Sequence, residues 1–428
     1  MAPAAFHHIW LFLVAFCAGA AVLHGEDFQG STHKVEFEGD VIRYNETPAN
    51  SAIERLQARI DSGEVKLTFD DTQGYLPSLL EALEVPKSSQ LLVFSKTSLQ
   101  RSHISPKRPR ALYFNDDVYI GFIPGAPLLE VSVADPKLGA VFYELEQTKL
   151  RKPKLVRSND CLQCHSSGRS MGVPGHVIRS VGTNRSGEID NQTEVSEITH
   201  CTPLADRWAG WYVTGTHGAQ THRGNLLGLS AFERHATEPN HAGNIQELNS
   251  FFDTSRYPKG SSDIVAHMVL EHQSHMHNYL TRLNFETQIM MSQYGHIRYL
   301  ERQVTAFLRY LLFTEETPLT EKIAGDPEFA QEFTGRGPKD KQGRSLRDFD
   351  LEKRLFKYPC SFLIYSEAFD NLPPVMKEHV LQRLWNILNS KEPHPDFAKL
   401  PESDRAAIKE ILIDTKAGLP DYWNAGST

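Results

Sequence analysis

The 428-residue chain lacks the features that mark several large protein classes. No long basic stripe occurs, and the formal net charge is -8, so we do not expect nucleic acid as a partner. After the first 25 residues, no apolar run approaches the roughly 20 residues that span a bilayer. Five cysteines are too few for a disulfide-dense scaffold. With 40% hydrophobic residues, the chain can bury a core of two or three domains, or one core with large insertions.

The first 25 residues differ from the rest of the chain. Ile9 to Leu23 form an apolar run, and Ala18-Gly19-Ala20 offers small residues for signal-peptidase cleavage. Before this run stand His7 and His8 but no Lys or Arg. We predict a signal peptide over residues 1–25 and export to the periplasm or an equivalent extracytoplasmic space. A buried N-terminal helix or an uncleaved anchor is the alternative.

The remaining pattern predicts an α+β fold. Residues 26–150 form an α+β region with short helices and a small antiparallel sheet, because strand-like runs follow one another without alternating helices. The expected helices are Ser51–Ser62 and Leu76–Leu83. The expected strands are Gln90–Phe94, Ala111–Phe114, Val118–Ile123, Leu128–Val133 and Val141–Leu145, with a hairpin turn at Asn115-Asp116-Asp117.

Two further regions follow. Residues 151–260 are rich in Gly, His, Ser and Thr, show little periodicity and predict a loop-rich segment. Residues 261–428 are mainly α-helical, with breaks at prolines. The expected helices are a long one capped by Asp263 and running to about Tyr294, then His296–Phe313, Pro327–Phe333, Leu351–Tyr365, Pro374–Leu388 and Ser403–Thr415.

The loop-rich segment contains Cys161-Leu162-Gln163-Cys164-His165. Two thiols at i and i+3 lie on one side of a helical turn and can add across the two vinyl groups of one haem. His165 then stands next to the iron as an axial ligand. Cys-x-x-Cys-His is the attachment signature of c-type haem.

Other uses of this motif are less consistent with the sequence. A thioredoxin-like pair needs a flanking βαβ unit, which residues 152–160 do not suggest. A zinc site needs a second close ligand pair, and His200-Cys201 lies far along the chain. A simple disulfide between Cys161 and Cys164 leaves His165 without a role.

At this motif the chain resembles the c-type cytochromes. The resemblance implies one covalent haem c, thioether attachment at Cys161 and Cys164, and His165 as proximal iron ligand. Small Met-ligated cytochromes c have the motif near the domain start and a distal Met some tens of residues later. Here Met171 is followed by no Met until Met268. We therefore expect a large mono-haem protein, with residues 151–260 as its haem-attachment region.

The sixth iron ligand has several candidates. On the long helix, Val265, Met268, His272, Met276 and Leu283 share one apolar stripe. His272 lies near its centre and is our distal candidate. The alternative is a core histidine with hydrogen-bond partners of its own.

Other residues offer weaker possibilities around the haem. Met171, His217 and His222 are further candidates for the sixth position, and an open distal site is another. Arg169, Arg179 and Arg207 have the guanidinium geometry that pairs with carboxylates such as the haem propionates. Each arginine is otherwise a surface charge. Trp208 and Trp211 either pack on the ring or fill the core.

The motif predicts electron transfer between the ferrous and ferric states, with a redox partner protein that the sequence does not identify. One alternative is a peroxidase- or oxidase-like oxidoreductase, with His272, His275 or Glu271 as acid–base group. Another is a haem-based sensor with an open distal site. Cys201 and Cys360 remain as a possible disulfide or as two separate thiols.

Overall fold

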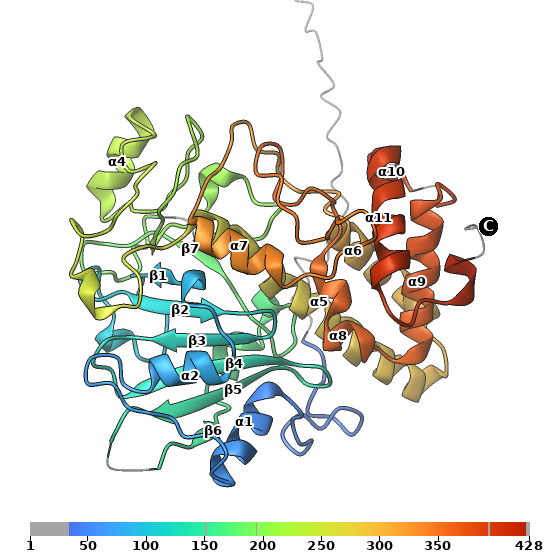
Figure 1. The fold of residues 1–428 in the computed structure, drawn as a ribbon, viewed down its shortest axis with the longest axis horizontal. Coiled ribbons are helices and arrows are strands. Elements are labelled where there is room, and N and C mark those ends of the chain that lie inside the picture. The colour runs from blue at the N-terminus through green and yellow to red at the C-terminus, as the bar shows by residue number, and fades with distance from the viewer. Residues whose placement is uncertain (1–33, 150–151, 194, 393, 425–428) are drawn as a thin grey trace, which may run out of the picture.

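The fold is built around an antiparallel sheet of seven strands in the order β6-β5-β4-β3-β2-β1-β9 (Figure 1). This computed structural model describes residues 34–149, 152–193, 195–392 and 394–424, so the predicted signal peptide lies outside the described residues. The strands are β1 (Leu91–Val93), β2 (Arg110–Phe114), β3 (Val118–Phe122), β4 (Leu128–Asp135), β5 (Gly139–Glu146), β6 (Leu155–Arg157) and β9 (Trp211–Tyr212).

Two hairpins set the register of the sheet. Between β2 and β3, the side-chain oxygen of Asn115 accepts hydrogen bonds from the backbone N–H groups of Asp117 and Val118. This confirms the predicted turn. Between β4 and β5, Gly139 pairs with Asp135 and has a φ of +72°. A side chain at position 139 would disfavour this backbone conformation.

The two faces of the sheet have different cover. On the inner face, Leu129, Val131 and Val133 pack in one core with the helices α1 (Ala52–Asp61) and α2 (Leu76–Ala82). Ser51 and Glu54 cap α1 reciprocally, as their spacing at the start of the apolar repeat favours. On the outer face, Phe114 and Tyr119 belong to a second core shared with the C-terminal helices.

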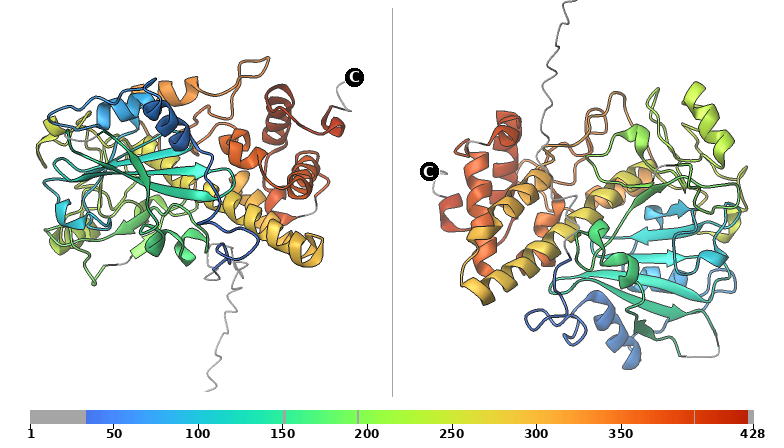
Figure 2. Two further views of the ribbon diagram at one scale, coloured as in Figure 1. Left: turned by 90° about the horizontal axis from the view of Figure 1, so that it is seen from below. Right: turned by 180° about the vertical axis from the view of Figure 1, so that it is seen from behind.

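The long helix α5 (Ile264–Tyr294) joins these two cores. Its 31 residues extend about 46 Å, and it runs between the sheet and the C-terminal helices (Figure 2). As predicted, Asp263 caps its start by accepting from Ala266 N–H at 2.8 Å. Gly295 ends it with a φ of +70°. Because both faces are covered, most of α5 is buried all round.

The remaining helices confirm the α+β prediction. They are α6 (Glu301–Leu311), α7 (Pro327–Gly335), α8 (Glu367–Asp370), α9 (Pro374–Leu388), α10 (Pro395–Ala398) and α11 (Glu402–Thr415). The predicted helices at the positions of α6, α7, α9 and α11 are therefore present, with small differences at their ends.

One predicted helix, Leu351–Tyr365, is wrong. Leu351 has a φ of +58°, and Phe349 pairs with Phe356 across an antiparallel bridge. The Asp350 side chain accepts from the N–H groups of Glu352 and Lys353, which stabilises a turn instead. Only Phe362–Tyr365 forms a short 3-10 helix.

The middle region is loop-rich, as predicted, but it also contributes to the sheet. Its short elements include β6, β9, α3 (Leu162–His165), α4 (Leu229–Thr237) and the two-stranded sheet of β7 (Arg179–Val181) and β8 (Val195–Glu197). The edge strands β6 and β9 were missed because each is only two or three residues long.

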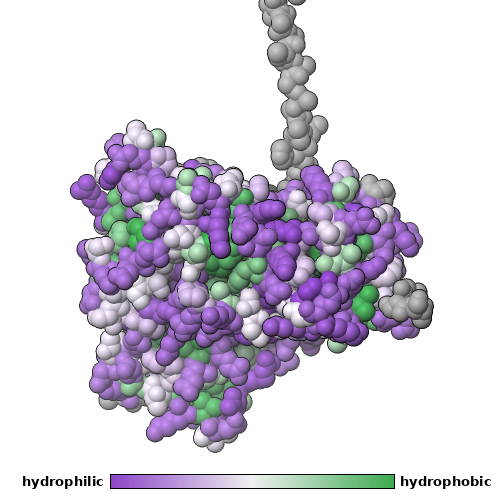
Figure 3. All heavy atoms as spheres, turned by 45° about the horizontal axis from the view of Figure 1, so that its top comes forward, coloured by the Kyte–Doolittle hydropathy of each residue, from purple (hydrophilic) through white to green (hydrophobic). Residues whose placement is uncertain are grey.

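The surface is polar for the most part. The face in Figure 3 shows small, separate apolar areas among hydrophilic residues. Within the described ranges, no helix is both long enough and apolar enough to cross a membrane.

Candidate functional site

The Cys161–His165 motif forms a single helical turn that follows the edge strand β6. Cys161 occupies the N-cap of α3, and its carbonyl accepts from Cys164 N–H at 3.2 Å and His165 N–H at 3.0 Å. Neither cysteine is in a disulfide; Cys161 is half-buried and Cys164 is exposed. The two thiols are thus presented near the surface on one turn, as thioether attachment to a haem requires.

The ring of His165 is held in one orientation. Its Nδ1–H donates to the carbonyl oxygen of Gly175 at 2.9 Å, and Gly175 N–H donates to the His165 carbonyl at 2.8 Å. Nε2 has no hydrogen-bond partner among the described residues. A ring fixed through Nδ1 with Nε2 available is the usual arrangement of a metal-binding histidine. Burial lowers the pKa of His165, which favours the neutral, ligating form.

The loop that holds His165 is itself held by α5. The side chain of Asn278 accepts from His176 N–H at 2.8 Å and donates to the His176 carbonyl at 2.7 Å. A Cβ at Gly175 would overlap the Asn278 side-chain oxygen. Gly175 is therefore required by close packing against the helix that positions the proximal loop.

His176 is a residue of the site that sequence reasoning missed. Its Nε2 is 3.0 Å from Ser132 Oγ, and its ring packs on Tyr119 with centroids 4.2 Å apart. Phe142 contacts both His176 and His165. The signal was a histidine directly after the Gly-Val-Pro-Gly run, eleven residues beyond His165, but only the folded sheet brings Ser132 and Phe142 to it.

The motif faces the outer side of the sheet, where charged residues gather. Burial raises the pKa of the Cys161 thiol to about 11, and the carboxylates of Glu130 and Glu144 contribute to this rise. Arg110 and Glu130 also act on the pKa of His165. Acidic and basic side chains of β2, β4 and β5 therefore lie close to both Cys161 and His165.

The three predicted propionate partners have different surroundings. Arg169 pairs with Glu197 at 2.9 Å in an exposed position. Burial lowers the pKa of Arg179, which lies half-buried on β7. Arg207 is buried in an ion pair with Glu271, and it also donates to the His200 carbonyl at 3.1 Å. Arg207 is thus engaged in the interior, whereas Arg169 and Arg179 lie near the motif.

The predicted tryptophans fill the core. Trp208 donates through Nε1 to Glu271 at 3.2 Å, and Trp211 donates through Nε1 to the Arg179 carbonyl at 2.7 Å. Both belong to the buried cluster around α5.

His272, the distal candidate, lies on the side of α5 that faces the C-terminal helices. Its Nε2 is 2.8 Å from Ser361 Oγ, and its Nδ1 is 2.9 Å from Nδ1 of His200. Phe313 and Tyr310 stack on its ring. Both ring nitrogens are engaged, so the structure has the alternative arrangement, a core histidine with its own partners, and does not bring His272 to His165.

The other sixth-ligand candidates are also engaged in contacts within the fold. Met171 is buried, and its carbonyl accepts from Arg282. His217 Nε2 accepts from Asn244 N–H at 3.0 Å, and His222 Nδ1 accepts from Gly224 N–H at 3.0 Å. These two histidines stabilise the loops that contain them.

The acid–base candidates Glu271 and His275 line a small cavity between α5 and the β7–β8 hairpin, together with His176. Burial raises the pKa of Glu271 to about 8, against the attraction of Arg207. The cavity volume of about 10 Å³ suits roughly one water molecule, so it has no room for a larger substrate.

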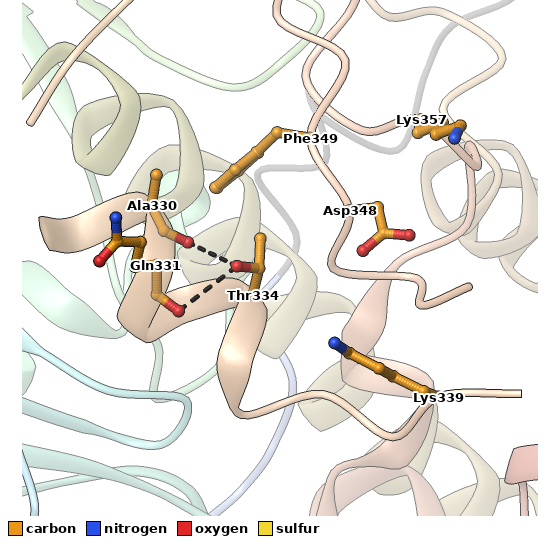
Figure 4. Close-up of a pocket in the computed structure, with 7 residues that line it drawn as sticks. All are labelled: Ala330, Gln331, Thr334, Lys339, Asp348, Phe349 and Lys357. Atoms are coloured by element: carbon orange, nitrogen blue, oxygen red, sulfur yellow. Dashed lines mark hydrogen bonds between the residues drawn. The ribbon is translucent and has the colours of Figure 1, made fainter. Parts of the chain in front are cut away.

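A second pocket, of about 420 Å³, lies apart from the motif beside α7 (Figure 4). Lys339, Asp348 and Lys357 contribute charges and Phe349 an aromatic wall. The Thr334 hydroxyl donates back to backbone carbonyls of its own helix, as the dashed lines show. No nucleophile–base pair is formed by the residues that line this pocket.

The geometry gives little support to the alternative uses of the motif. Strand β6 pairs antiparallel with β5, so the motif does not follow the strand of a βαβ unit. Within the described part of the chain, no three His, Cys, Asp or Glu side chains are grouped to hold a metal ion by themselves. No disulfide joins Cys201 to Cys360; Cys360 is buried and Cys201 half-buried.

Comparison with known proteins does not place this chain in a family. No family model matches it, and neither the curated proteins nor the solved structures yield a match. Its function therefore has to be argued from the site alone.

Proposed function

We propose that this chain is an exported, mono-haem c-type electron-transfer protein. The observation that supports this most is the arrangement at His165: Nδ1 is fixed by the Gly175 carbonyl, and Nε2 is left without a partner beside two thiols on one turn. At His272, in contrast, both ring nitrogens have partners.

The residues present fit a covalent haem. Cys161 and Cys164 would hold it through thioethers, and His165 Nε2 would bind the iron. The bound group would supply reversible one-electron chemistry. The protein holds the proximal ring in place through Gly175 and Asn278, and the pair Arg110–Glu130 supplies charge nearby.

The direct test is expression with an export signal and a functioning haem c maturation system. We expect coloured protein whose denatured mass includes one haem, with a low-spin spectrum that carbon monoxide and peroxide leave unchanged. A high-spin, ligand-binding spectrum would favour the oxidoreductase or the sensor instead.

Matched cysteine variants make this test specific. Cys161→Ser with Cys164→Ser should abolish covalent attachment, whereas Cys201→Ser should retain it. Colourless wild-type protein whose mass lacks the macrocycle would refute the proposal.

A further inference from the structure

One row of residues on the outer face of the sheet lies next to the motif. Leu112 on β2 stands opposite Gly121 on β3, Gly121 opposite Glu130 on β4, and Glu130 opposite Glu144 on β5. Since adjacent strands are about 4.8 Å apart, the last three positions alone span roughly 10 Å. The right-hand view of Figure 2 shows this side of the sheet, with the green segment around α3 lying over it beside α5.

This row differs from the neighbouring row on the same face. Phe114, Tyr119 and Phe142, two positions along their strands, are buried, by α5 and by the loop that contains His176. In contrast, Leu112 and Glu144 are only half-buried. An apolar side chain and charged groups thus share a partly open surface beside Cys161.

The ion pair Arg110–Glu130 crosses this row. Arg110 Nη2 lies 2.6 Å from Glu130 Oε2, and the two side chains are 22% and 20% exposed. The Arg110 Nε–H is buried and has no hydrogen-bond partner among the described residues. Glu130 therefore fixes the position of the Arg110 charge beside the attachment site.

Glu130 is held in the ionised state by several donors. Burial opposes its ionisation, but Arg110, Ser98 and Gln100 together lower its pKa. Ser98 Oγ donates to it at 2.6 Å and Gln100 Nε2 at 3.2 Å. A carboxylate with three donors keeps its charge and its place when a neighbouring group changes charge.

Gly121 gives Arg110 its path across the sheet. A Cβ at position 121 would come 2.6 Å from Arg110 Nη2 and 2.8 Å from Nε. The backbone of Gly121 is not in the left-handed region, so its φ does not require glycine. The close approach of the guanidinium does, because it leaves no room for a Cβ.

We propose that the outer-face row Leu112, Gly121, Glu130 and Glu144 is the surface on which the haem lies, and that the Arg110–Glu130 pair fixes its reduction potential. This rests on the proposed haem attachment at Cys161 and Cys164. Arg110 would then be the guanidinium beside the bound group, whereas Arg207 is engaged with Glu271 in the interior. Arg110 and Glu130 are positioning residues, since neither binds the iron.

The test is an equilibrium redox titration of the purified, haem-loaded protein. Loss of a negative charge near the iron favours the reduced state, so Glu130→Gln should raise the midpoint potential. Arg110→Gln should lower it, and the double variant should lie near the wild type. Gly121→Ala, which displaces Arg110 without removing its charge, should shift the potential in the same direction as Arg110→Gln.

The controls are Arg169→Gln and Glu197→Gln, which remove the members of an exposed ion pair near the motif. Their shifts should be several times smaller, because water screens exposed charges. Haem-loaded protein in which Glu130→Gln and Arg110→Gln shift the potential no more than these controls would overturn the inference and leave the proposed function intact. Failure to attach haem at all would instead refute the proposed function.

Discussion

At the scale of single residues, the orientation of His165 depends on one glycine and one asparagine outside the motif. Gly175 provides the carbonyl that orients His165, and Asn278 binds both backbone groups of the next residue, His176. The orientation of the proximal ring is therefore set by the distance between this loop and α5.

Gly175→Ala should destabilise the fold by about 1–3 kcal/mol, because the new methyl group overlaps the Asn278 side chain. Asn278→Ala should cost a similar amount, about 1–3 kcal/mol, through two lost buried hydrogen bonds. In the double variant the overlap is relieved, so its destabilisation should be smaller than the sum of the two single-variant values. Urea unfolding of the four proteins measures this; strict additivity would contradict the packing described.

The sequence predicted the local arrangement of this site better than its surroundings. The motif spacing predicted Cys161, Cys164 and His165 as a unit, because all three lie within one helical turn. It did not predict Arg110, which meets the motif only through strand pairing over a long sequence separation. Nor did it predict His176, because its position depends on contacts with Ser132 and Asn278. His272 looked special because a histidine interrupted an apolar stripe, yet Ser361 and His200 satisfy it in the folded core.

At the scale of elements, helix α5 connects the motif loop, the sheet and the C-terminal helices. Its ends were predictable from sequence, because Asp263 and Gly295 are local signals that need no tertiary contact. The absent helix at Leu351–Tyr365 shows the opposite case. There, the Asp350 turn and the Phe349–Phe356 bridge outweigh an apolar pattern that resembled a helix.

The two caps of α5 should differ in their contribution to stability. Gly295→Ala meets no atom within 4 Å, so only the left-handed backbone opposes it, at about 1 kcal/mol. Asp263→Ala should cost more, about 2 kcal/mol, since its other oxygen also accepts from Asp326 N–H at 2.6 Å. Thermal or urea unfolding followed by helical circular dichroism provides the comparison. An equal or smaller cost for Asp263→Ala would show that the second contact contributes nothing.

At the scale of the whole molecule, the interior contains both histidines and carboxyl groups whose pKa values are shifted by burial. Burial lowers the pKa of His267 to about 3 and that of His277 to about 4. Burial also raises the pKa of Asp117 to about 7 and that of Asp263 to about 7. The two sets affect stability in opposite directions with pH.

The free energy of unfolding should therefore be greatest near pH 6.5. Buried neutral histidines stabilise the fold above their unfolded pKa of about 6.5, and this is lost as the pH falls toward 4, by about 3 kcal/mol for His277 alone. Buried protonated carboxyls stabilise the fold at low pH, and this is lost as the pH rises through about 7. The buried histidines outnumber the buried protonated carboxyls, so the free energy of unfolding should fall more steeply on the acid side of the maximum than on the alkaline side.

Urea midpoints between pH 4 and pH 9 test this profile. His277→Gln should make the loss of stability at acid pH less steep, because the Gln amide does not titrate. The amide can still donate to the Asp116 carbonyl that His277 now contacts, so the local contact is kept. Asp117→Asn should make the loss of stability at alkaline pH less steep. A stability that is constant from pH 4 to pH 9 would show that these groups are not buried as described.

The partial burial of Cys161 has a consequence for how the protein is made. A thiol with a pKa near 11 is almost entirely protonated at neutral pH and is a poor nucleophile. In the finished fold it would react slowly with a vinyl group, because burial and the neighbouring carboxylates together disfavour the thiolate. If the proposed haem is attached here, biosynthesis should join the porphyrin to a still open polypeptide, which then folds around it.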